Sequence, residues 1–395
     1  MLIQQTLIQY LLQKKNLCEI FKVLTIWGNI NLLIRPQHHQ YMERYATCGK
    51  DRMETEMKGK ATVQGGSGLS RGKQPEIMVS ICCITYNQEP YIRDALEGFL
   101  KQKTDFAYEI LIHDDASGDG TGEIIREYAK QYPDRIFPVI QTENQYSQGI
   151  TNISGTFNFP RARGRYIAMC EGDDYWTDAR KLQRQVDFME AHPDCSLCFH
   201  SARIDVQERA LTERRMRPYR GSRRVSPEEI IDKTSGYPTA SLLFRRAMVE
   251  HLPDFYVQAP IADIPLQLMA AARGWGYYMD RPMCVYRLGG ASSWTTLMKQ
   301  GDYERKQQEY ARAMRKMYRG FDEETGGRFH RTVNRGIARL VYLTKVNTRQ
   351  YNVVLNKKYR RFYRELNPRT RFFIRLETLA PWLYRWLWKV FHKQV

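Results

Sequence analysis

The chain has 395 residues, a hydrophobic content of 43% and a formal net charge of +18. This length and hydrophobic content suit one large domain with appendages, or two domains, and exclude a chain that stays unfolded. The charge is uneven, because residues 301–395 hold 23 Lys and Arg against 8 Asp and Glu. A basic tail on a nearly neutral body indicates an anionic partner, lipid headgroups or nucleic acid, unless it is only a solvated basic face.

The N-terminal residues 1–75 lack a sustained hydrophobic pattern, and we expect a loosely attached extension that an upstream start codon could explain. No apolar run in the chain reaches the roughly 18 residues that span a bilayer. The N-terminus also lacks the small-residue cleavage site of a signal peptide. A cytoplasmic protein is therefore expected.

The eight cysteines do not form a disulfide framework, since several lie in apolar runs and the rest are scattered. Cys195 and Cys198 have the spacing of half a zinc site, but no second pair stands nearby. Their alternation with apolar residues favours a core strand, and reduced thiols fit a cytosolic protein.

From Met78 onward, apolar runs of strand length alternate with stretches of helical spacing. The first expected elements are strands at 78–85, 108–113, 136–141, 166–170 and 196–199, with helices at 91–101 and 179–191 and one that follows 121. Later elements are strands at 236–244 and 283–287, with a helix at 262–272. Such alternation predicts a mostly parallel α/β sheet that binds ligands at the carboxyl ends of its strands.

Polar residues stand at these strand ends. Thr85, Tyr86 and Asn87 follow the first strand, and Asp114 and Asp115 follow the second. The two aspartates either cap the next helix or accept hydrogen bonds from a ribose or a base. No Gly-x-Gly-x-x-Gly follows the first strand, which disfavours a dinucleotide cofactor.

The sequence Glu171-Gly-Asp-Asp-Tyr-Trp176 holds three carboxylates within four residues, at the end of a buried strand. The acids either cap the following helix or bind a hard divalent ion such as Mg²⁺ or Mn²⁺, which in turn suits a diphosphate. Their place after several strand–helix units favours the metal–diphosphate interpretation.

Beyond this cluster, residues 203–224 are polar and basic and are expected to form a mobile loop. Asp263 precedes Pro265 at a helix start, where an aspartate is most often a cap. In residues 376–393, apolar and basic residues recur at helical spacing, together with Trp382, Trp386 and Trp388. Such a helix either packs on the protein's own core or lies at an anionic membrane surface, and its Trp and cations favour the membrane.

The ordered motifs of residues 78–294 resemble glycosyltransferase family 2 with the GT-A fold. They are Thr-Tyr-Asn, Asp-Asp-Ala-Ser-x-Asp-Gly-Thr, Ala-Arg-Gly-Arg-Tyr-Ile-Ala and Glu-Gly-Asp-Asp-Tyr-Trp. The resemblance implies a GT-A domain at 76–298, with a nucleotide-sugar half at 76–200 and an acceptor half at 201–298. Residues 299–395 would then form a helical, basic and aromatic extension.

The resemblance also implies roles for single residues. Thr85, Tyr86 and Asn87 would line the nucleotide pocket, and Asp115 with Asp114 would hold the base and ribose. Glu171-Gly-Asp173 occupies the family's Asp-x-Asp position. Asp173 and Asp174 would then contact the metal and the diphosphate, and Glu171, which replaces the family's first Asp, would be a supporting ligand. Asp263 falls where the family places its catalytic base, and Trp294 would stack on a sugar ring.

One position departs from the family pattern, because Leu288 stands where similar enzymes often place a His that completes the metal shell. The resemblance as a whole implies an inverting glycosyltransferase that uses Mn²⁺ or Mg²⁺ and a nucleotide sugar, and a UDP-sugar is the first donor expected. Its acceptor would be a glycan or lipid-linked precursor of a cell-surface polysaccharide, at the cytoplasmic face of the membrane.

Three alternatives remain from the residues alone. A nucleotidyltransferase would share the sheet and the acidic site, although no Gly-rich basic loop follows the first strand. A nucleic-acid module would explain the basic tail, but no recognition signature supports it, and no nucleic acid is expected as a partner. A binding-only homologue would explain Leu288.

Overall fold

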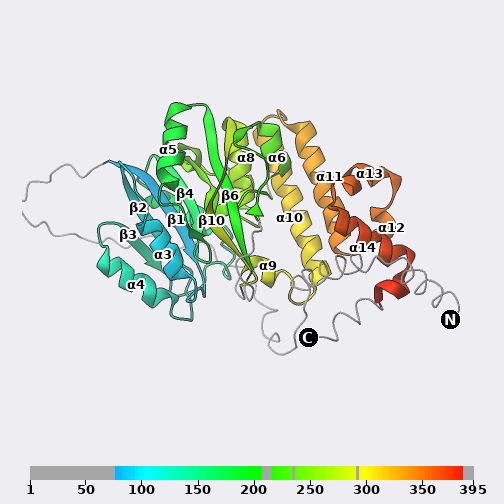
Figure 1. Cartoon of the computed structure of the whole chain (residues 1–395), viewed down its shortest axis with the longest axis horizontal. Coiled ribbons are helices and arrows are strands. Elements are labelled where there is room, and N and C mark those ends of the chain that lie inside the picture. The colour runs from blue at the N-terminus through cyan, green and yellow to red at the C-terminus, as the bar shows by residue number, and fades with distance from the viewer. Residues whose placement is uncertain (1–75, 207–214, 234–235, 291–292, 386–395) are drawn as a thin grey trace, which may run out of the picture. The chain divides into compact units, whose positions relative to one another are not determined.

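The structure, a computed structural model, describes residues 76–206, 215–233, 236–290 and 293–385. Residues Glu76–Arg385 form one compact unit. Within the described residues, one sheet has the strand order β3-β2-β1-β4-β9-β6-β10-β5, with β7 beside β6 and β8 beside β10 (Figure 1). Pairing is parallel from β3 to β4 and between β6 and β10, whereas β9 is antiparallel to both neighbours. The mostly parallel sheet confirms the predicted fold class.

The strands are β1 (Ile77–Thr85), β2 (Ala107–Asp114), β3 (Ile136–Ile140), β4 (Tyr166–Glu171), β5 (Tyr175–Trp176), β6 (Cys195–Val206), β7 (Arg215–Met216), β8 (Arg223–Val225), β9 (Leu243–Arg245) and β10 (Trp275–Leu288). The first helices are α3 (Ile92–Leu100), α4 (Thr121–Gln131), α5 (Lys181–Ala191), α6 (Pro227–Lys233), α7 (Asp254–Val257) and α8 (Asp263–Arg273). The later ones are α9 (Trp294–Leu297), α10 (Tyr303–Glu324), α11 (His330–Asn347), α12 (Tyr351–Val354), α13 (Arg360–Glu365) and α14 (Pro368–Leu379).

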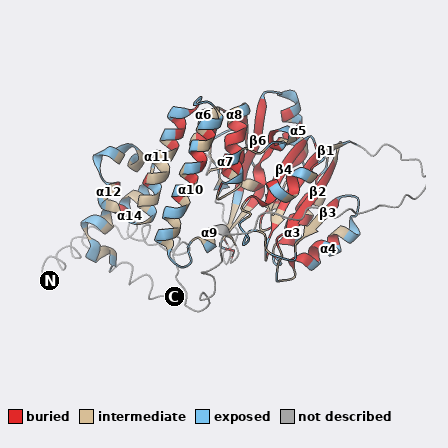
Figure 2. Ribbon diagram, turned by 180° about the vertical axis from the view of Figure 1, so that it is seen from behind, coloured by how far each residue is buried: buried red, intermediate tan, exposed pale blue. Residues whose placement is uncertain are grey.

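The sheet is buried on both faces, as its continuous apolar strands predict. Val79, Ile81 and Cys83 of β1 join a cluster that holds the apolar sides of α3, α4 and α5. Cys82, on the opposite face, joins a cluster with residues of α6, α8 and α10. Buried residues concentrate in the sheet and in the helix faces that cover it (Figure 2).

The predicted strand at 236–244 is wrong for most of its length. A 3-10 turn occupies Thr239–Ser241, and only Leu243–Arg245 pairs as a strand. Pro238 starts the turn, because its carbonyl accepts hydrogen bonds from both the N–H and the hydroxyl of Ser241. Proline lacks the N–H that a central strand would need, which limits pairing to the last residues.

The predicted strand at 283–287 is longer than expected. β10 starts at Trp275, and its register against β6 shifts between Met279 and Cys284, a segment that contains Pro282. A proline inside a strand is tolerated at such an irregularity. Because Pro282 interrupts the apolar pattern, the sequence predicted only the second half of the strand. The loop predicted at 203–224 contains the end of β6, together with β7 and β8; its residues 207–214 lie outside the described ones.

The expected helix over 376–393 is interrupted. α14 ends at Leu379, Ala380 departs from helical geometry, and a new helical turn starts at Pro381. Proline cannot donate the N–H that would continue α14, and it suits the first turn of a new helix. The predicted extension 1–75 and residues 386–395 lie outside the described residues. None of the described helices is long and apolar enough to cross a bilayer.

Candidate active site

The three polar loops named from the sequence meet at one edge of the sheet. In the parallel register, Thr85 of β1 lies opposite Asp114 of β2, and Ile84 lies opposite Glu171 of β4. The three strands therefore end at the same level, and the residues that follow them share the carboxyl edge, where open α/β sheets bind ligands.

The loops after β1 and β2 are joined by hydrogen bonds. The Asn87 N–H donates to the Ser117 hydroxyl at 2.9 Å, and the Asn87 side-chain oxygen accepts from the Gly118 N–H at 2.8 Å. Asn87 has a positive φ of 51°, a conformation that Asn adopts more readily than most residues. Tyr86 is 39% exposed, whereas Thr85 is buried and its hydroxyl has no hydrogen-bond partner. The loop thus presents one exposed ring and one unsatisfied hydroxyl.

Both aspartates after β2 are engaged by the protein. Asp114 accepts from the hydroxyl and the N–H of Ser117, and burial raises the pKa of its carboxyl. Asp115 accepts from the N–H groups of Gln145 and Tyr146, at 2.8 and 3.0 Å. Asp114 therefore shapes its own loop, while Asp115 draws the segment after β3 across the edge of the sheet. A contact of either residue with a nucleotide stays a prediction.

The acidic turn after β4 packs directly on the first loop. A Cβ at Gly172 would lie 2.5 Å from the Gln88 side-chain oxygen and 2.9 Å from the Thr85 Cβ. The Gly172 N–H also donates to the Ile84 carbonyl at 2.9 Å. Only glycine permits this approach, and the contact places the acidic turn beside the unsatisfied hydroxyl of Thr85.

Asp174 lies deeper than its neighbours in the turn. It is 1% exposed, one carboxylate oxygen accepts from the Arg287 N–H at 2.9 Å, and the other has no hydrogen-bond partner. Burial raises the pKa of Asp174 well above its ordinary value, and the charges of Asp173 and Glu171 raise it further. Asp174 thus ties the turn to β10, and it is less accessible than Asp173 or Glu171.

Glu171 and Asp263 interact electrostatically, although they are far apart in the sequence. Burial raises the pKa of Glu171 to about 8, and the charges of Asp173 and Asp263 contribute. Burial likewise raises the pKa of Asp263, against a hydrogen bond from the Ile264 N–H. The first residue of α8 therefore lies within electrostatic reach of the acidic turn.

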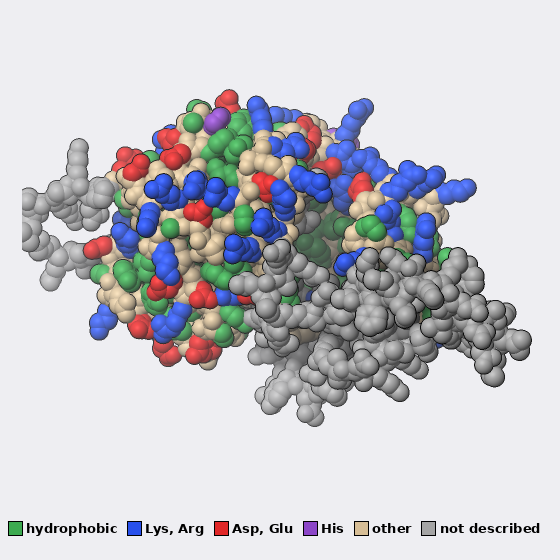
Figure 3. Space-filling view, in the orientation of Figure 1, with side chains coloured by type: hydrophobic (Ala, Val, Ile, Leu, Met, Phe, Trp, Pro, Cys, Tyr) green, Lys and Arg blue, Asp and Glu red, His purple; other side chains and the backbone are tan. Residues whose placement is uncertain are grey.

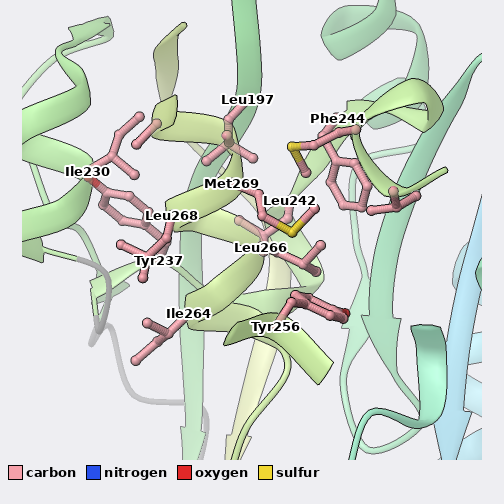
Figure 4. Packing of buried hydrophobic residues seen from close by; sticks show 14 of the residues in the cluster. Leu197, Ile230, Tyr237, Leu242, Phe244, Tyr256, Ile264, Leu266, Leu268 and Met269 are labelled. Atoms are coloured by element: carbon pink, nitrogen blue, oxygen red, sulfur yellow. The ribbon is translucent and has the colours of Figure 1, made fainter. Parts of the chain in front are cut away.

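Packing fixes the position of α8. Figure 4 shows Ile264, Leu266, Leu268 and Met269 of this helix among buried side chains of neighbouring elements, including Tyr256. Because these side chains have little freedom to move, the start of the helix is held in place. Burial raises the pKa of Tyr256, and the Asp263 charge contributes; the Tyr256 hydroxyl has no hydrogen-bond partner.

Two residues of β10 that sequence reasoning did not single out also belong to this site. Burial raises the pKa of Tyr286, and the charges of Glu171, Asp174, Asp173 and Asp263 act in the same direction. The Arg287 guanidinium donates to the Asp173 carbonyl at 3.0 Å, and its charge lowers the pKa values of Asp173 and Asp174 against the larger effect of burial. The only available signal was their place at the end of an apolar strand.

Arg287 also links the acidic turn to other elements. It pairs with Asp94 of α3, lies 3.9 Å from Asp205 of β6, and stacks over the rings of Tyr91 and Tyr175 at 5.0 and 4.4 Å. Its side chain is only 10% exposed. One cation thus holds together four separate parts of the chain around the acidic turn.

Glu171 and Asp173 suit a hard divalent ion, because carboxylate oxygens are the ligands that such ions prefer. Burial raises the pKa of both groups, so a bound cation would stabilise their charged forms. Their arrangement does not form a closed shell, since no three His, Cys, Asp or Glu side chains of the described residues are grouped to enclose a metal. Leu288 ends β10 at the position of the expected His. Trp294 begins α9, and its contact with a sugar stays a prediction.

Comparisons with known proteins point to one family. Residues 80–252 match the model of glycosyl transferase family 2. An uncharacterized protein of Mycobacterium tuberculosis is 36% identical over 220 residues, which cover 55% of this chain and 60% of that protein. The Bacillus subtilis glycosyltransferase TuaG, named for teichuronic acid biosynthesis, is 33% identical over 131 residues, 33% of this chain and 49% of that one.

Among solved structures, residues 1–349 of Staphylococcus aureus TarS in complex with UDP-GlcNAc share the fold with a TM-score of 0.52. They are 14% identical, and the similarity covers 77% of this chain and 88% of that one. The sheet and its flanking helices are therefore those of the GT-A fold.

Proposed function

We propose that the protein is an inverting, metal-dependent glycosyltransferase, because residues 80–252 match the model of glycosyl transferase family 2. It would move a sugar from a nucleoside-diphosphate sugar to a hydroxyl group of a glycan or lipid-linked acceptor. The observation that carries this proposal is the parallel register that brings Thr85, Asp114 and Glu171 to one carboxyl edge of the sheet. The first residue of α8, Asp263, lies within electrostatic reach of the acidic turn at that edge. A carboxylate base and a site for a leaving diphosphate are the two elements that the reaction requires.

In the proposed mechanism, Asp263 accepts the proton of the acceptor hydroxyl as that oxygen attacks the anomeric carbon. Burial raises its pKa, which makes it a better proton acceptor than an exposed aspartate. A single base on the side opposite the leaving group leads to inversion at the anomeric carbon. Besides burial, the Asp263 charge contributes to the raised pKa of Glu171, which would act on the side of the diphosphate.

Asp173 and Asp174 would hold the divalent ion, Mn²⁺ or Mg²⁺, with Glu171 supporting them; one carboxylate oxygen of Asp174 has no hydrogen-bond partner in the protein. When bound, the ion stabilises the charge that grows on the departing diphosphate. With few protein ligands, diphosphate oxygens and water would complete its shell, which is common for Mg²⁺ sites. Thr85 and Tyr86 would line the nucleotide pocket, Asp114 and Asp115 would shape it, and Trp294 would contact a sugar.

The donor and the acceptor are proposed from the relatives. A UDP-sugar is the first donor to test, because the TarS structure holds UDP-GlcNAc. TuaG is named for teichuronic acid biosynthesis, which supports a cell-surface polysaccharide as the destination. We propose that residues 76–200 bind the donor, that residues 201–298 bind the acceptor, and that residues 299–395 anchor the enzyme at the inner face of the membrane.

The decisive experiment measures nucleoside-diphosphate release from a panel of nucleotide sugars, with Mn²⁺, with Mg²⁺ and with a chelator. Asp263→Asn should lower kcat by about 10²–10⁴-fold while donor binding is unchanged. Asp254→Asn is the matched control, since Asp254 begins α7 and is exposed. Wild-type turnover of Asp263→Asn would contradict the assignment of the base.

The same assay separates the alternatives. A nucleotidyltransferase would release pyrophosphate from a nucleoside triphosphate and a sugar phosphate. A binding-only homologue would bind the donor in calorimetry but release no diphosphate with any metal. Either result would replace the proposed reaction.

A further inference from the structure

Helix α14 has one face in the protein and one face in solvent. Ile374 is buried and packs with Tyr342 and Val354 in a small cluster of the C-terminal helices. Phe372 is 51% exposed and Leu379 is 80% exposed. Residues three, four or seven positions apart share a helix face, so Phe372 and Leu379 point to the same side. The inner face already has its packing partners, which leaves the outer apolar residues without a place in the core.

Cations flank these apolar residues. Arg369 and Arg375 lie on the same side of α14 as Phe372, and both are exposed. Trp382, in the helical turn after Pro381, is 48% exposed, and Arg385 follows it. We name these six exposed residues, four on one side of α14 and two in the turn after Pro381, the outer face: Arg369, Phe372, Arg375, Leu379, Trp382 and Arg385. The side that α11 and α13 present in Figure 3 is also rich in Lys and Arg.

Most cations of residues 351–385 form no ion pair with the described part of the chain. Residues 351–385 hold nine Lys and Arg but only Glu365 and Glu377 as acids. Glu365 pairs with Arg339 at 3.0 Å and with Arg361 at 3.5 Å, and Glu377 pairs with Arg349 at 3.1 Å. Within the described part of the chain, Arg369, Arg375 and Arg385 therefore have no carboxylate partner.

We propose that the outer face docks the enzyme on a bilayer that contains anionic lipids. A Trp, a Phe and a Leu among arginines without a carboxylate partner suit the headgroup region, where apolar side chains enter the interface and cations meet lipid phosphates. The Arg375 guanidinium also lies 5.8 Å from the centroid of the Tyr363 ring. A solvated basic face would explain the arginines but not three large apolar side chains exposed among them. This proposal rests on the proposed function, because it names the side chains and the lipid charge for the membrane anchoring proposed there for residues 299–395.

The test is co-flotation of the full chain with vesicles of phosphatidylcholine alone or with 30% phosphatidylglycerol, at about 0.1 M salt. Wild-type protein should float with the anionic vesicles only. Each cation near an anionic surface contributes about a factor of five in binding, so Arg369→Glu with Arg375→Glu should lower it at least tenfold. Leu379→Ser with Trp382→Ser should lower it comparably by removing the inserted side chains.

Matched controls are available on other surfaces. Arg126→Glu with Lys130→Glu removes the same charge from exposed positions of α4, and Tyr132→Ser with Val257→Ser removes exposed apolar side chains elsewhere. These variants should float like wild type. Equal losses in the controls, or binding that depends only on net charge, would overturn the proposal.

Two further readouts keep this proposal separate from the enzymatic one. Diphosphate release with a soluble acceptor should be unchanged in the outer-face variants, so that loss of flotation cannot be mistaken for a damaged active site. A gel shift with single-stranded RNA at the same salt should show no outer-face dependence. RNA binding that these substitutions abolish, without vesicle binding, would assign the surface to nucleic acid instead.

Discussion

Replacing Arg287 is expected to loosen the acidic turn as well as the fold. The Arg287 guanidinium donates to the Asp173 carbonyl, pairs with Asp94 and stacks over Tyr91 and Tyr175. Arg287→Ala removes all of these contacts but keeps the backbone N–H that Asp174 accepts. The turn would stay attached to β10 but lose the cation that compensates its carboxylates.

The magnitude follows from the exposure of each partner. The charge-assisted hydrogen bond to the Asp173 carbonyl is worth about 1.5–3 kcal/mol. The pair with Asp94 contributes only about 0–1 kcal/mol, because Asp94 is half exposed. Each ring contact adds about 0.5–1 kcal/mol. Since such terms overlap, we expect Arg287→Ala to lower the free energy of unfolding by about 3 kcal/mol.

Arg287→Lys keeps the charge but cannot reach Asp94 and the Asp173 carbonyl together, so the loss should be about half as large, ~1.5 kcal/mol. Urea unfolding followed by tryptophan fluorescence measures both values. In Arg287→Ala the pKa of Asp173 should rise, because its compensating cation is gone. The acidic limb of the pH–rate profile should therefore move to higher pH, with a higher KM for the donor.

Arg245→Ala is the matched control. Arg245 donates to the Met189 carbonyl at 2.7 Å and lies over the Tyr166 ring at 5.2 Å, at the opposite end of β4 from the acidic turn. It should lose similar stability without a change in KM or in the pH profile. If Arg287→Ala behaves in the same way as this control, Arg287 supports the fold and does not position the site.

Three further outcomes are expected. Gly172→Ala should raise the donor KM, because the added Cβ would press on Gln88 and Thr85. Gly236→Ala is the control, because its added Cβ would lie 3.6 Å from the nearest neighbouring atom and should leave the KM unchanged. Equal effects of the two substitutions in steady-state kinetics would refute the packing argument. In metal-free protein the folded-state pKa of Glu171, about 8, lies above its ordinary 4.5. Between these two pKa values the folded state keeps a proton that the unfolded state releases, so Tm should fall as the pH rises from 4.5 to about 8. Glu171→Gln should flatten this dependence of Tm on pH. An unchanged dependence would contradict the burial of Glu171. Arg163→Ala should lower the free energy of unfolding by about 2–3 kcal/mol, because the buried Glu109 keeps only the Ser80 hydroxyl and one N–H as donors; a loss below about 0.5 kcal/mol in urea unfolding would contradict this.

The sequence was most informative where local pattern and burial agree. β1, β2 and β4 are continuous apolar runs, and parallel pairing requires their polar ends to share one edge, so the neighbourhood of Thr85, Asp114 and Glu171 could be predicted. Helices α3 and α5 carry a regular apolar face. In each case the spacing of the apolar residues predicts both the type of the element and its buried face.

The parts that failed depend on distant partners. Arg287 acts through residues of three other elements, and no local pattern records such contacts. The inward orientation of Asp174 likewise depends on the N–H of a residue in β10. Pro282 interrupts the apolar pattern of β10, yet the strand continues past it through a shift in register. Pro238 starts a turn inside an apolar run that resembles a strand. Whether a proline ends a strand depends on whether the neighbouring strand accommodates an irregular register.

The link between Asp174 and β10 has a consequence for the order in which the domain assembles. Its two ends are 113 residues apart in the chain, and the pair of Arg287 with Asp94 spans 193. At roughly 5–20 residues per second, the ribosome exposes the acidic turn some 5–25 s before Arg287 emerges. During that interval the carboxylates of the acidic turn lack the compensating charge of Arg287 in β10. A fragment cut at residue 252, where the family match ends, would stay in that condition, with its acids present and both Asp263 and Arg287 missing.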